Sequence, residues 1–306
     1  MGLNLFKFET EQKVFDIGGV KVGGQPGQYP TALIGSIFFH GDKTVLDEKI
    51  GTFDKEAVEV SIKQAEEFSE KTGNPSIIDI VGAWPEALAK YIDFVADTTD
   101  STFLVDGTTS EVRIAGVKRV KEAGLTDRVI YNTIMPGYKQ EELDTLKKSE
   151  VKSAILLTFN PKMPTLSGRL EVLEGLLKAA DQAGIEKPLV DTAILDMPDP
   201  GPAGKTIFLV KKRYGLPAGC GAHNAIDRWH QRKKLDKMRY CMSSAVAFTS
   251  IIAMGGNFLL YGPLGRAPQV FPTVALADAY VAYSMRQEYG IGPAVKNHPL
   301  TRIFTL

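Results

Sequence analysis

The chain of 306 residues is poor in the residue types that mark several classes of protein. Its two cysteines, Cys220 and Cys241, are too few for a disulfide framework and suit a reducing compartment. Lysine plus arginine and aspartate plus glutamate number 36 each, so the net charge is zero. This balance argues against a protein that coats nucleic acid or an anionic membrane surface.

Histidine is also scarce, with four in the whole chain. His40 and His223 end predicted strands and could meet across one edge of a sheet. Cys220 and His223 look like a ligand pair, but an odd separation on a strand directs two side chains to opposite faces. We therefore predict no metal site.

Long hydrophobic runs are absent as well. The N-terminal segment MGLNLFKFETEQK carries charges at Lys7, Glu9 and Glu11, so it does not have the pattern of a secretory signal. The longest apolar stretch, residues 243–262, contains two adjacent glycines and several polar residues. It predicts a buried helix that runs into a strand rather than a membrane span. We expect a cytoplasmic protein without a membrane segment.

The chain does contain a regular alternation of short β-branched runs and longer amphipathic segments. The predicted strands are residues 31–39, 76–81, 102–106, 128–134, 153–159, 188–193, 217–223 and 257–262. Glycines that suit left-handed helix ends follow four of the helical segments, at Gly73, Gly124, Gly184 and Gly215. Such alternation indicates parallel strands joined by right-handed helical crossovers.

Eight strand–helix units that end in a helix over residues 271–290 favour a closed barrel. A doubly wound open sheet would fit the same alternation, but we predict a (β/α)8 TIM barrel. A pattern around Gly18 and Gly19 predicts a short N-terminal hairpin against the barrel floor. Neither a repeat nor a linker divides the sequence, so residues 1–306 are expected to form one α/β domain.

The C-terminal ends of the predicted strands carry a series of short polar side chains. The series is Asp79, Asp106, Asn132, Asn160 and Asp191, with His223 and Asn224 after the seventh strand. In TIM barrels the chemistry takes place at these strand ends. Asp and Asn are common where strands stop, because they cap helices and tolerate turns. Five in succession, each after an apolar run, indicate instead a polar pocket.

The residue types in this series favour one kind of ligand. The sixth strand has no lysine at its end, where a Schiff-base enzyme of this fold often keeps one. A planar heterocycle with donors along its edge fits better. A carboxylate can accept from both N3–H and the 2-amino group of a pterin, and an asparagine can donate or accept at N1, O4, N5 or N8.

Two further segments could carry function. DPGPAGKT, residues 199–206, is similar to a phosphate-binding loop, but Asp199 stands where that loop requires glycine. Residues 228–239, RWHQRKKLDKMR, are the only strong charge run and fall in the predicted loop after the seventh strand. The run is either the solvated start of a helix or a docking edge for an acidic partner or a polyanionic cofactor tail.

Long motifs give the chain a specific resemblance. They are GVKVGGQPGQYPTALIGSIFF, TGNPSIIDIVG, YIDFVADTTDSTFLVDGTTSEVRIAG, DRVIYNTI, LLTFNPKMP, KPLVDTAILDMPDPGPAG and GAHNA. In order and spacing they resemble the H-subunit family of tetrahydromethanopterin S-methyltransferase over nearly the whole chain. Within that family the chain looks most like the stand-alone bacterial enzymes that pass a methyl group from a methylated corrinoid protein to tetrahydrofolate.

The resemblance implies a barrel methyltransferase in which Asp106, Asn132 and Asp191 hold the pterin. The implied reaction is an in-line displacement, in which N5 of tetrahydrofolate takes the methyl group from cobalt. Asn132 and Asn160 would hydrogen-bond near N5, and Asp79 would remove the N5 proton. The predicted cofactor-binding residues are thus Asp106, Asn132, Asn160, Asp191, His223 and Asn224, and the predicted catalytic residues are Asp79, Asn132 and Asn160.

The same resemblance implies a homodimer and a partner protein that carries cobalamin. Two alternatives remain. The pterin could be tetrahydromethanopterin, with the chain as one component of a larger methyltransferase complex. An enzyme similar to dihydropteroate synthase would also bind a pterin, but it needs basic residues at the ends of strands seven and eight, and here the seventh ends in His223 and Asn224.

Overall fold

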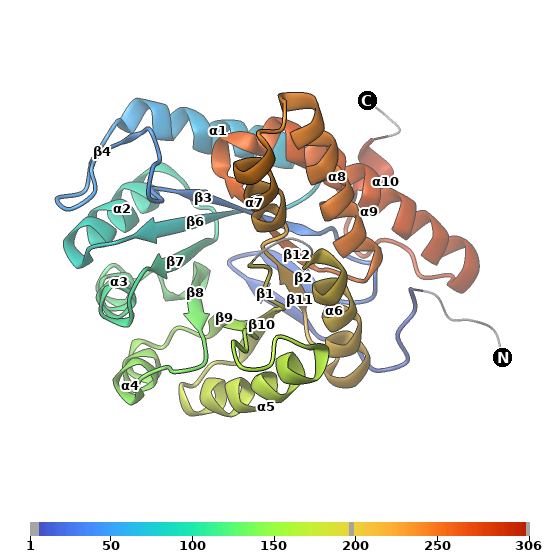
Figure 1. The fold of residues 1–306 in the computed structure, drawn as a ribbon, viewed down its shortest axis with the longest axis horizontal. Coiled ribbons are helices and arrows are strands. Elements are labelled where there is room, and N and C mark those ends of the chain that lie inside the picture. Colours follow the sequence, from blue (N-terminus) through green and yellow to red (C-terminus); the bar gives the residue numbers. More distant parts are fainter. Residues whose placement is uncertain (1–5, 196–198, 304–306) are drawn as a thin grey trace.

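The computed structural model describes residues 6–195 and 199–303, and it contains a closed barrel of eight parallel strands (Figure 1). Around the barrel the strands are β3 (Ala32–Ile37), β6 (Ser76–Gly82), β7 (Phe103–Gly107), β8 (Val129–Ile134), β9 (Ser153–Leu157), β10 (Lys187–Asp191), β11 (Ala218–Cys220) and β12 (Phe258–Pro263). β12 pairs with β3 and closes the barrel. The predicted (β/α)8 fold is confirmed.

Helices follow the strands along the chain and surround the barrel (Figure 1). They are α1 (Lys55–Thr72), α2 (Pro85–Thr98), α3 (Ser110–Glu122), α4 (Gln140–Ser149), α5 (Leu166–Gln182), α6 (Pro200–Tyr214), α7 (His223–Lys233), α8 (Lys237–Ala253), α9 (Ala267–Tyr289) and α10 (Pro299–Arg302). The connection from β3 to α1 also contains a two-stranded hairpin, β4 (Val45–Asp47) and β5 (Thr52–Phe53).

The four predicted cap glycines all have left-handed backbone angles. Gly73 and Gly215 end α1 and α6 directly, with φ of +84° and +62°. At Gly73 an added Cβ would lie 1.8 Å from the Asn297 carbonyl oxygen, so only glycine fits between α1 and the C-terminal segment. These ends set the point at which each chain segment turns back toward the barrel.

The predicted apolar stretch over residues 243–262 is a helix followed by a strand, as expected. α8 ends at Ala253, and β12 begins at Phe258 after a turn at Gly255 and Gly256. Within the part of the chain that the structure describes, no helix is both long and apolar enough to cross a membrane.

Several predicted boundaries near the barrel mouth are wrong, and two of them flank α7. The seventh strand spans only Ala218–Cys220, and His223 is already the first residue of α7. The reason is the glycine-rich sequence around it, which weakens strand formation. The charge run over residues 228–239 is predicted to fall in a loop, but most of it is helical. It forms the second half of α7 and, after residues 234–236, the first residues of α8, so the interpretation as the start of a helix is confirmed for residues 237–239. Arg, Lys, Gln and Met are good helix formers.

The N-terminal hairpin closes the floor of the barrel. β1 (Val14–Ile17) pairs with β2 (Val20–Gly23), and both turn residues between them have positive φ. Ile17 and Val22 are buried against an apolar layer of inward-facing strand residues: Ala32, Ile34, Ile77, Leu104, Ile130, Ile155, Leu189 and Phe258. The Thr102 hydroxyl donates to the Ile17 carbonyl oxygen over 2.9 Å and ties the hairpin to the start of β7. The predicted hairpin and its position are confirmed.

Truncating the floor residue Ile17 to alanine is expected to cost about 2–5 kcal/mol of unfolding free energy, because its fully buried side chain would leave a cavity. Urea denaturation of the Ile17→Ala protein measures this loss. Val20→Ala, at a half-buried position of the same hairpin, is the matched control and should cost much less. Equal losses for the two variants would contradict the role of Ile17 as a plug.

Candidate active site

A ring of polar side chains lies directly above the apolar layer, toward the carboxyl ends of the strands. Strand side chains alternate, so the residue two positions after an inward-facing one also faces inward. Two positions after inward-facing residues of the apolar layer, five strands carry a polar residue: Ser36, Asp79, Asp106, Asn132 and Asp191. We call these five residues the polar ring. It joins residues from β3, β6, β7, β8 and β10, which lie far apart in the sequence.

Four members of the polar ring lie on adjacent strands. Ser36 is the Cα partner of Asp79, and Asp106 is the Cα partner of Asn132. The Ser36 hydroxyl donates to Asp79 Oδ2 over 2.7 Å, and Asn132 Nδ2 donates to Asp79 Oδ1 over 3.3 Å. Asp79 therefore orients the Asn132 amide, whose Oδ1 accepts no hydrogen bond from the described residues. That oxygen is available to a donor on a bound ligand.

Ser36 is the member of the polar ring that the sequence analysis missed. The first strand was expected to run to residue 39, which hid the true end at Ile37. The available signal was alternation: Ala32 and Ile34 face the barrel interior, so Ser36 must face it too. A hydroxyl at that position gives Asp79 a second hydrogen-bond donor besides the Asn132 amide.

Burial dominates the electrostatics of the ring carboxyl groups. Desolvation raises the pKa of Asp79 to about 6, although Ser36 and Asn132 oppose the shift by hydrogen bonding to it. The pKa of Asp106 is raised well above its usual value, first by desolvation and then by the negative charge of Asp79. Arg113 and the Gly107 amide act in the opposite direction on Asp106. The negative charge of Asp79 therefore disfavours ionisation of Asp106.

Asp191 ends β10, on the opposite side of the barrel from β6. Its Oδ1 accepts from the Ala193 amide over 2.8 Å, and Ala193 has a left-handed φ of +57°. Its other carboxylate oxygen accepts no hydrogen bond from the residues described. Desolvation raises the pKa of Asp191 to about 6, and the nearby positive charge of Arg169 lowers it in part. Asp191 therefore offers a fixed acceptor that faces the rest of the polar ring across the barrel.

Asn160 and Asn224 lie outside the polar ring and bond to the backbone of the loops. Asn160 comes three residues after β9, and its Oδ1 accepts from the amides of Lys162 and Met163 over 3.1 and 3.0 Å. Asn224 Nδ2 donates to the Ile194 carbonyl oxygen over 2.9 Å. Both side chains shape loops at the mouth, so ligand contact would require them to exchange these bonds.

His223 lies at the mouth between β11 and β12. Its Nδ1 is 2.9 Å from the Leu260 carbonyl oxygen, an acceptor only, so the ring proton is on Nδ1 and the Nε2 lone pair is left for another partner. Burial lowers the pKa of His223, which favours this neutral form. His40 does not meet it: the His40 side chain is 93% exposed and pairs with Glu48. The described residues include no group of three or more metal-ligating side chains.

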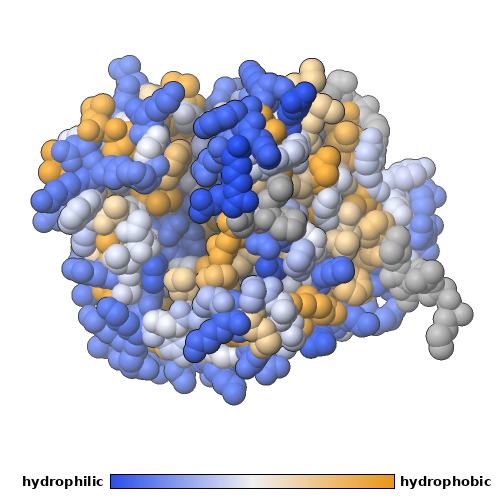
Figure 2. Space-filling view, in the orientation of Figure 1, coloured by the Kyte–Doolittle hydropathy of each residue, from blue (hydrophilic) through white to orange (hydrophobic). Residues whose placement is uncertain are grey.

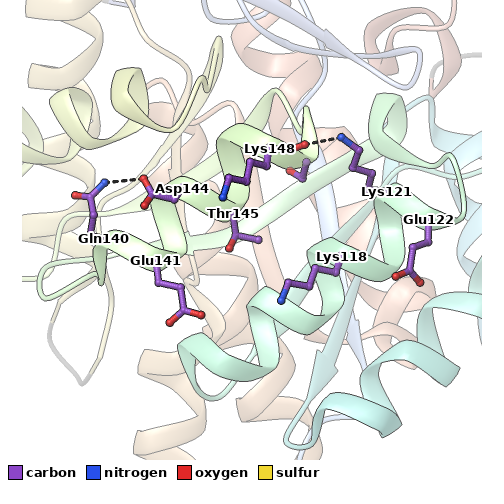
Figure 3. Close-up of a pocket in the computed structure, with 9 residues that line it drawn as sticks. Lys118, Lys121, Glu122, Gln140, Glu141, Asp144, Thr145 and Lys148 are labelled. Carbon is purple, nitrogen blue, oxygen red and sulfur yellow. Dashed lines mark hydrogen bonds between the residues drawn. The ribbon is translucent and has the colours of Figure 1, made fainter.

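A groove of about 790 Å³ lies between α3 and α4, on the outside of the barrel (Figure 3). Figure 3 shows charges of both signs along it, with Lys118 and Lys121 on one helix and Glu141 and Asp144 on the other. These side chains come from exposed helix faces rather than from strand ends. The groove is therefore separate from the polar ring, and we assign it no part in the chemistry.

Hydrophilic side chains stand out over α7 on the face shown in Figure 2. Arg228 and Lys233 on α7, and Lys234 directly after it, are exposed residues of the charge run. α7 starts at the mouth with His223, and these charges follow along its second half and just after its end.

Carboxylates, an amide and a hydroxyl lie at the carboxyl ends of the barrel strands. This arrangement is typical of an enzyme that binds a polar substrate in the mouth of the barrel. Residues 10–294 match the model of the tetrahydromethanopterin S-methyltransferase MtrH subunit family. The chain belongs to this family and is a methyltransferase, as its motifs predict.

Similar proteins span nearly the whole chain. The H-subunit of the tetrahydromethanopterin S-methyltransferase of Methanothermobacter thermautotrophicus is 40% identical over 311 residues, covering 98% of this chain and all of that protein. The corresponding protein of Methanocaldococcus jannaschii is 38% identical, with the same coverage of both chains. The H-subunit of a putative methyltransferase mtx of Methanosarcina barkeri is 39% identical and covers 97% of this chain and 99% of its own length.

Solved structures with the same fold include a dihydropteroate synthase of Yersinia pestis in complex with a pterine–sulfa conjugate. It superposes with a TM-score of 0.62 at 14% sequence identity, covering 88% of this chain and 99% of that chain. At this identity the likeness concerns the barrel fold alone.

Proposed function

We propose that the protein transfers a methyl group between a methylated corrinoid and N5 of a reduced pterin. The observation that carries this proposal is the polar ring in a chain of this methyltransferase family. The ring offers acceptors at Asn132 on β8 and at Asp191 on β10, with β9 between their strands, and a reduced pterin presents donors along the edges of a flat ring. The residues thus fit the pterin head group.

In this proposal Asp191 and Asp106 hold the pyrimidine edge of the pterin. A carboxylate that accepts from N3–H and from the 2-amino group makes two parallel charge-assisted hydrogen bonds, which fix the plane of the ligand. Asn132 lies beside Asp106, and its Oδ1 is directed away from Asp79. It can accept from N5–H before the transfer. His223 and Asn224 would contact the ligand at the rim of the mouth.

The proposed reaction is an in-line displacement. The N5 lone pair forms the new bond to the methyl carbon, the bond between carbon and cobalt breaks with its electron pair left on cobalt, and N5 loses one proton. Asp79 takes that proton, since its pKa of about 6 leaves it ionised at neutral pH. Asn132 and Asn160 stabilise the charge that develops at N5. Holding the reacting atoms in line contributes about 7–11 kcal/mol in favourable cases.

We propose tetrahydrofolate as the pterin, with tetrahydromethanopterin as the alternative. The names of the archaeal relatives support the alternative, since they specify tetrahydromethanopterin. The polar ring contacts the head group that the two pterins have in common, so it supports both equally.

The experiment is to mix the purified protein with methylcobalamin and either pterin, and to follow the loss of the methyl–cobalt absorbance. Transfer with one pterin identifies it as the substrate. The Asp79→Asn protein is the control, because it keeps the shape of the side chain and cannot take the N5 proton. Unchanged absorbance with both pterins would refute the proposed function.

A partner protein would supply the methylated corrinoid. The names of the relatives, which describe subunits of methyltransferases, support an enzyme that works with other chains. The basic surface on α7 supports an acidic partner, because opposite charge steers association. The two free cysteines, Cys220 and Cys241, support a cytoplasmic location.

We also propose that the protein forms a homodimer through α8 and α9. These helices pack against each other, and both expose apolar side chains: Met242 and Val246 on α8, and Leu276, Tyr280 and Tyr283 on α9. Val246 is 67% exposed and Tyr280 is 62% exposed, which is unusual for residues of this kind and typical of an interface core.

The Val246→Lys/Tyr280→Lys variant is expected to be monomeric, because two buried charges would be placed in the interface. Light scattering after gel filtration gives the mass of each protein. Leu46→Lys, at a residue 73% exposed on β4, is the control and should leave the dimer intact. A monomeric wild-type protein at micromolar concentration would refute the proposed dimer.

An enzyme similar to dihydropteroate synthase remains the second candidate. Its chemistry needs cations at the ends of the last two strands. Arg266 follows β12, but its guanidinium donates to the Tyr261 carbonyl oxygen and to Ser244 Oγ. These bonds support the methyl transfer rather than pyrophosphate release. Condensation of a pterin pyrophosphate with 4-aminobenzoate by the purified protein would favour this second candidate.

A further inference from the structure

A buried polar cluster lies behind the polar ring, on the outer side of the barrel wall. It consists of Arg113 on α3, Glu142 on α4 and Tyr131 on β8, which are 7%, 1% and 0% exposed. Charged residues are rarely buried to this degree unless they are paired. We call these three residues the wall cluster.

The three side chains of the wall cluster form hydrogen bonds with one another. Arg113 Nη2 and Nε donate to Glu142 Oε1 over 2.7 and 3.1 Å, and Nε also lies 3.0 Å from the Tyr131 hydroxyl. The Tyr131 hydroxyl donates to the same Glu142 oxygen. Arg113 Nη1 donates to the Gly107 carbonyl oxygen over 2.9 Å. One guanidinium therefore joins α3, α4, β8 and the end of β7.

Two of these attachment points are next to ligand-binding residues in the chain. Gly107 follows Asp106 directly, and Tyr131 precedes Asn132 directly. Asp106 and Asn132 are themselves Cα partners across β7 and β8. An added Cβ at Gly107 would lie 2.8 Å from Arg113 Cγ, so the arginine is packed tightly against the strand end. Movement of the wall cluster would therefore displace the backbone of both residues.

Stability alone does not account for such a cluster. The desolvation of a buried ion pair offsets much of its attraction, and apolar residues of similar size often stabilise a fold equally well. A planar guanidinium with several fixed donors instead holds its partners in one geometry. That geometry is useful where two neighbouring strands must present side chains in register to a ligand.

We propose that Arg113, held by Glu142 and Tyr131, is a positioning residue that fixes Asp106 and Asn132 for pterin binding. The proposal rests on the proposed function, in which these two residues hold the pterin.

The charge of Arg113 has a second effect on the same site. Besides desolvation, the negative charge of Asp79 on β6 raises the pKa of Asp106, and the positive charge of Arg113 on α3 lowers it together with the Gly107 amide. Without Arg113 the pKa of Asp106 would rise further. Asp106 would then hold a proton at higher pH and would accept fewer hydrogen bonds from the pterin.

The test replaces the cluster with apolar residues in the variant Arg113→Met/Tyr131→Phe/Glu142→Leu. Calorimetry with each pterin, steady-state kinetics and thermal unfolding are measured. We expect pterin Kd and KM to rise at least tenfold, KM for methylcobalamin to stay the same, and Tm to fall by only a few degrees. Arg119→Met/Asp93→Leu removes a second arginine–carboxylate pair of α3, which faces α2, and should leave pterin binding unchanged.

A second measurement does not require pterin binding. In protein labelled with ¹³C at the aspartate carboxyl groups, the Asp106 resonance should titrate at higher pH in the apolar variant, and the Asn132 side-chain amide signals should shift. Should the apolar variant fail to fold, Arg113→Lys serves instead, since it keeps the charge and loses the fork of donors. It should weaken pterin binding with little change in the Asp106 titration.

The outcomes separate the two proposals. A wild-type protein that binds no pterin refutes the proposed function, and the carboxyl titration then decides the role of Arg113 by itself. An unchanged Asp106 titration together with unchanged Asn132 signals in the folded apolar variant overturns the positioning role. Unchanged pterin affinity in that variant, where the wild type binds, overturns it as well.

Discussion

Replacing Asp191 with asparagine is expected to weaken pterin binding about 100-fold, or about 2.7 kcal/mol. The carboxylate presents acceptors only, and the oxygen that the Ala193 amide does not contact accepts no hydrogen bond from the described residues. An amide of the same shape keeps the bond from the Ala193 amide through Oδ1. Its NH2 group would then point a donor at the donors of the pterin, so one attractive charge-assisted bond becomes a repulsive contact.

Titration calorimetry with the reduced pterin measures this change directly. Asp16→Asn is the matched control, since Asp16 lies in the hairpin at the opposite end of the barrel and pairs with Lys21. It should leave the pterin Kd unaltered. An Asp191→Asn protein with wild-type affinity would show that Asp191 does not anchor the pterin.

The same Asp191→Asn substitution is expected to stabilise the pterin-free protein at pH 8. The pKa of Asp191 is about 6 in the folded protein, against 3.8 for an aspartate in water. Above pH 6 the carboxyl is charged in both states, and the buried charge then costs the folded state about 3 kcal/mol. Asparagine does not carry this cost. Below pH 3.8 the carboxyl is neutral in both states and the cost disappears.

Urea unfolding at pH 8 and pH 4 tests the sign of this change in the free energy of unfolding. The advantage of Asp191→Asn should be about 3 kcal/mol at pH 8 and should shrink to under about 1 kcal/mol at pH 4. Asp16→Asn should do the reverse at pH 8, because Lys21 lowers the pKa of Asp16 and its charge favours folding. A pH-independent difference between wild type and Asp191→Asn would contradict the assigned burial cost.

The two Asp191 predictions have opposite signs for one physical reason. A buried carboxylate without hydrogen-bond donors lowers the free energy of unfolding of the pterin-free protein. Donors of a bound pterin stabilise the same charge and offset that cost. Asp79 and Asp106 share this property, since burial raises both of their pKa values. Replacing these carboxylates with uncharged side chains is therefore expected to weaken pterin binding and to stabilise the fold.

Most of the candidate site could be identified from strand ends in the sequence. Asp79, Asp106, Asn132 and Asp191 each follow an apolar run, and all four face the barrel interior in the structure. Asn160 also follows such a run, yet its strand ends at Leu157 and the side chain builds a turn instead. A strand end and a turn carry the same residue types, so composition alone could not separate them.

Hydrophobic periodicity and glycine positions were enough to predict the barrel, the floor hairpin and the polar character of the mouth, because these patterns depend on local neighbours. Which polar residues contact one another became visible only in the folded chain. The bond from Ser36 to Asp79 and the wall cluster of Arg113, Tyr131 and Glu142 join segments 11 to 43 residues apart. Such contacts depend on barrel closure and strand register, which no local pattern specifies.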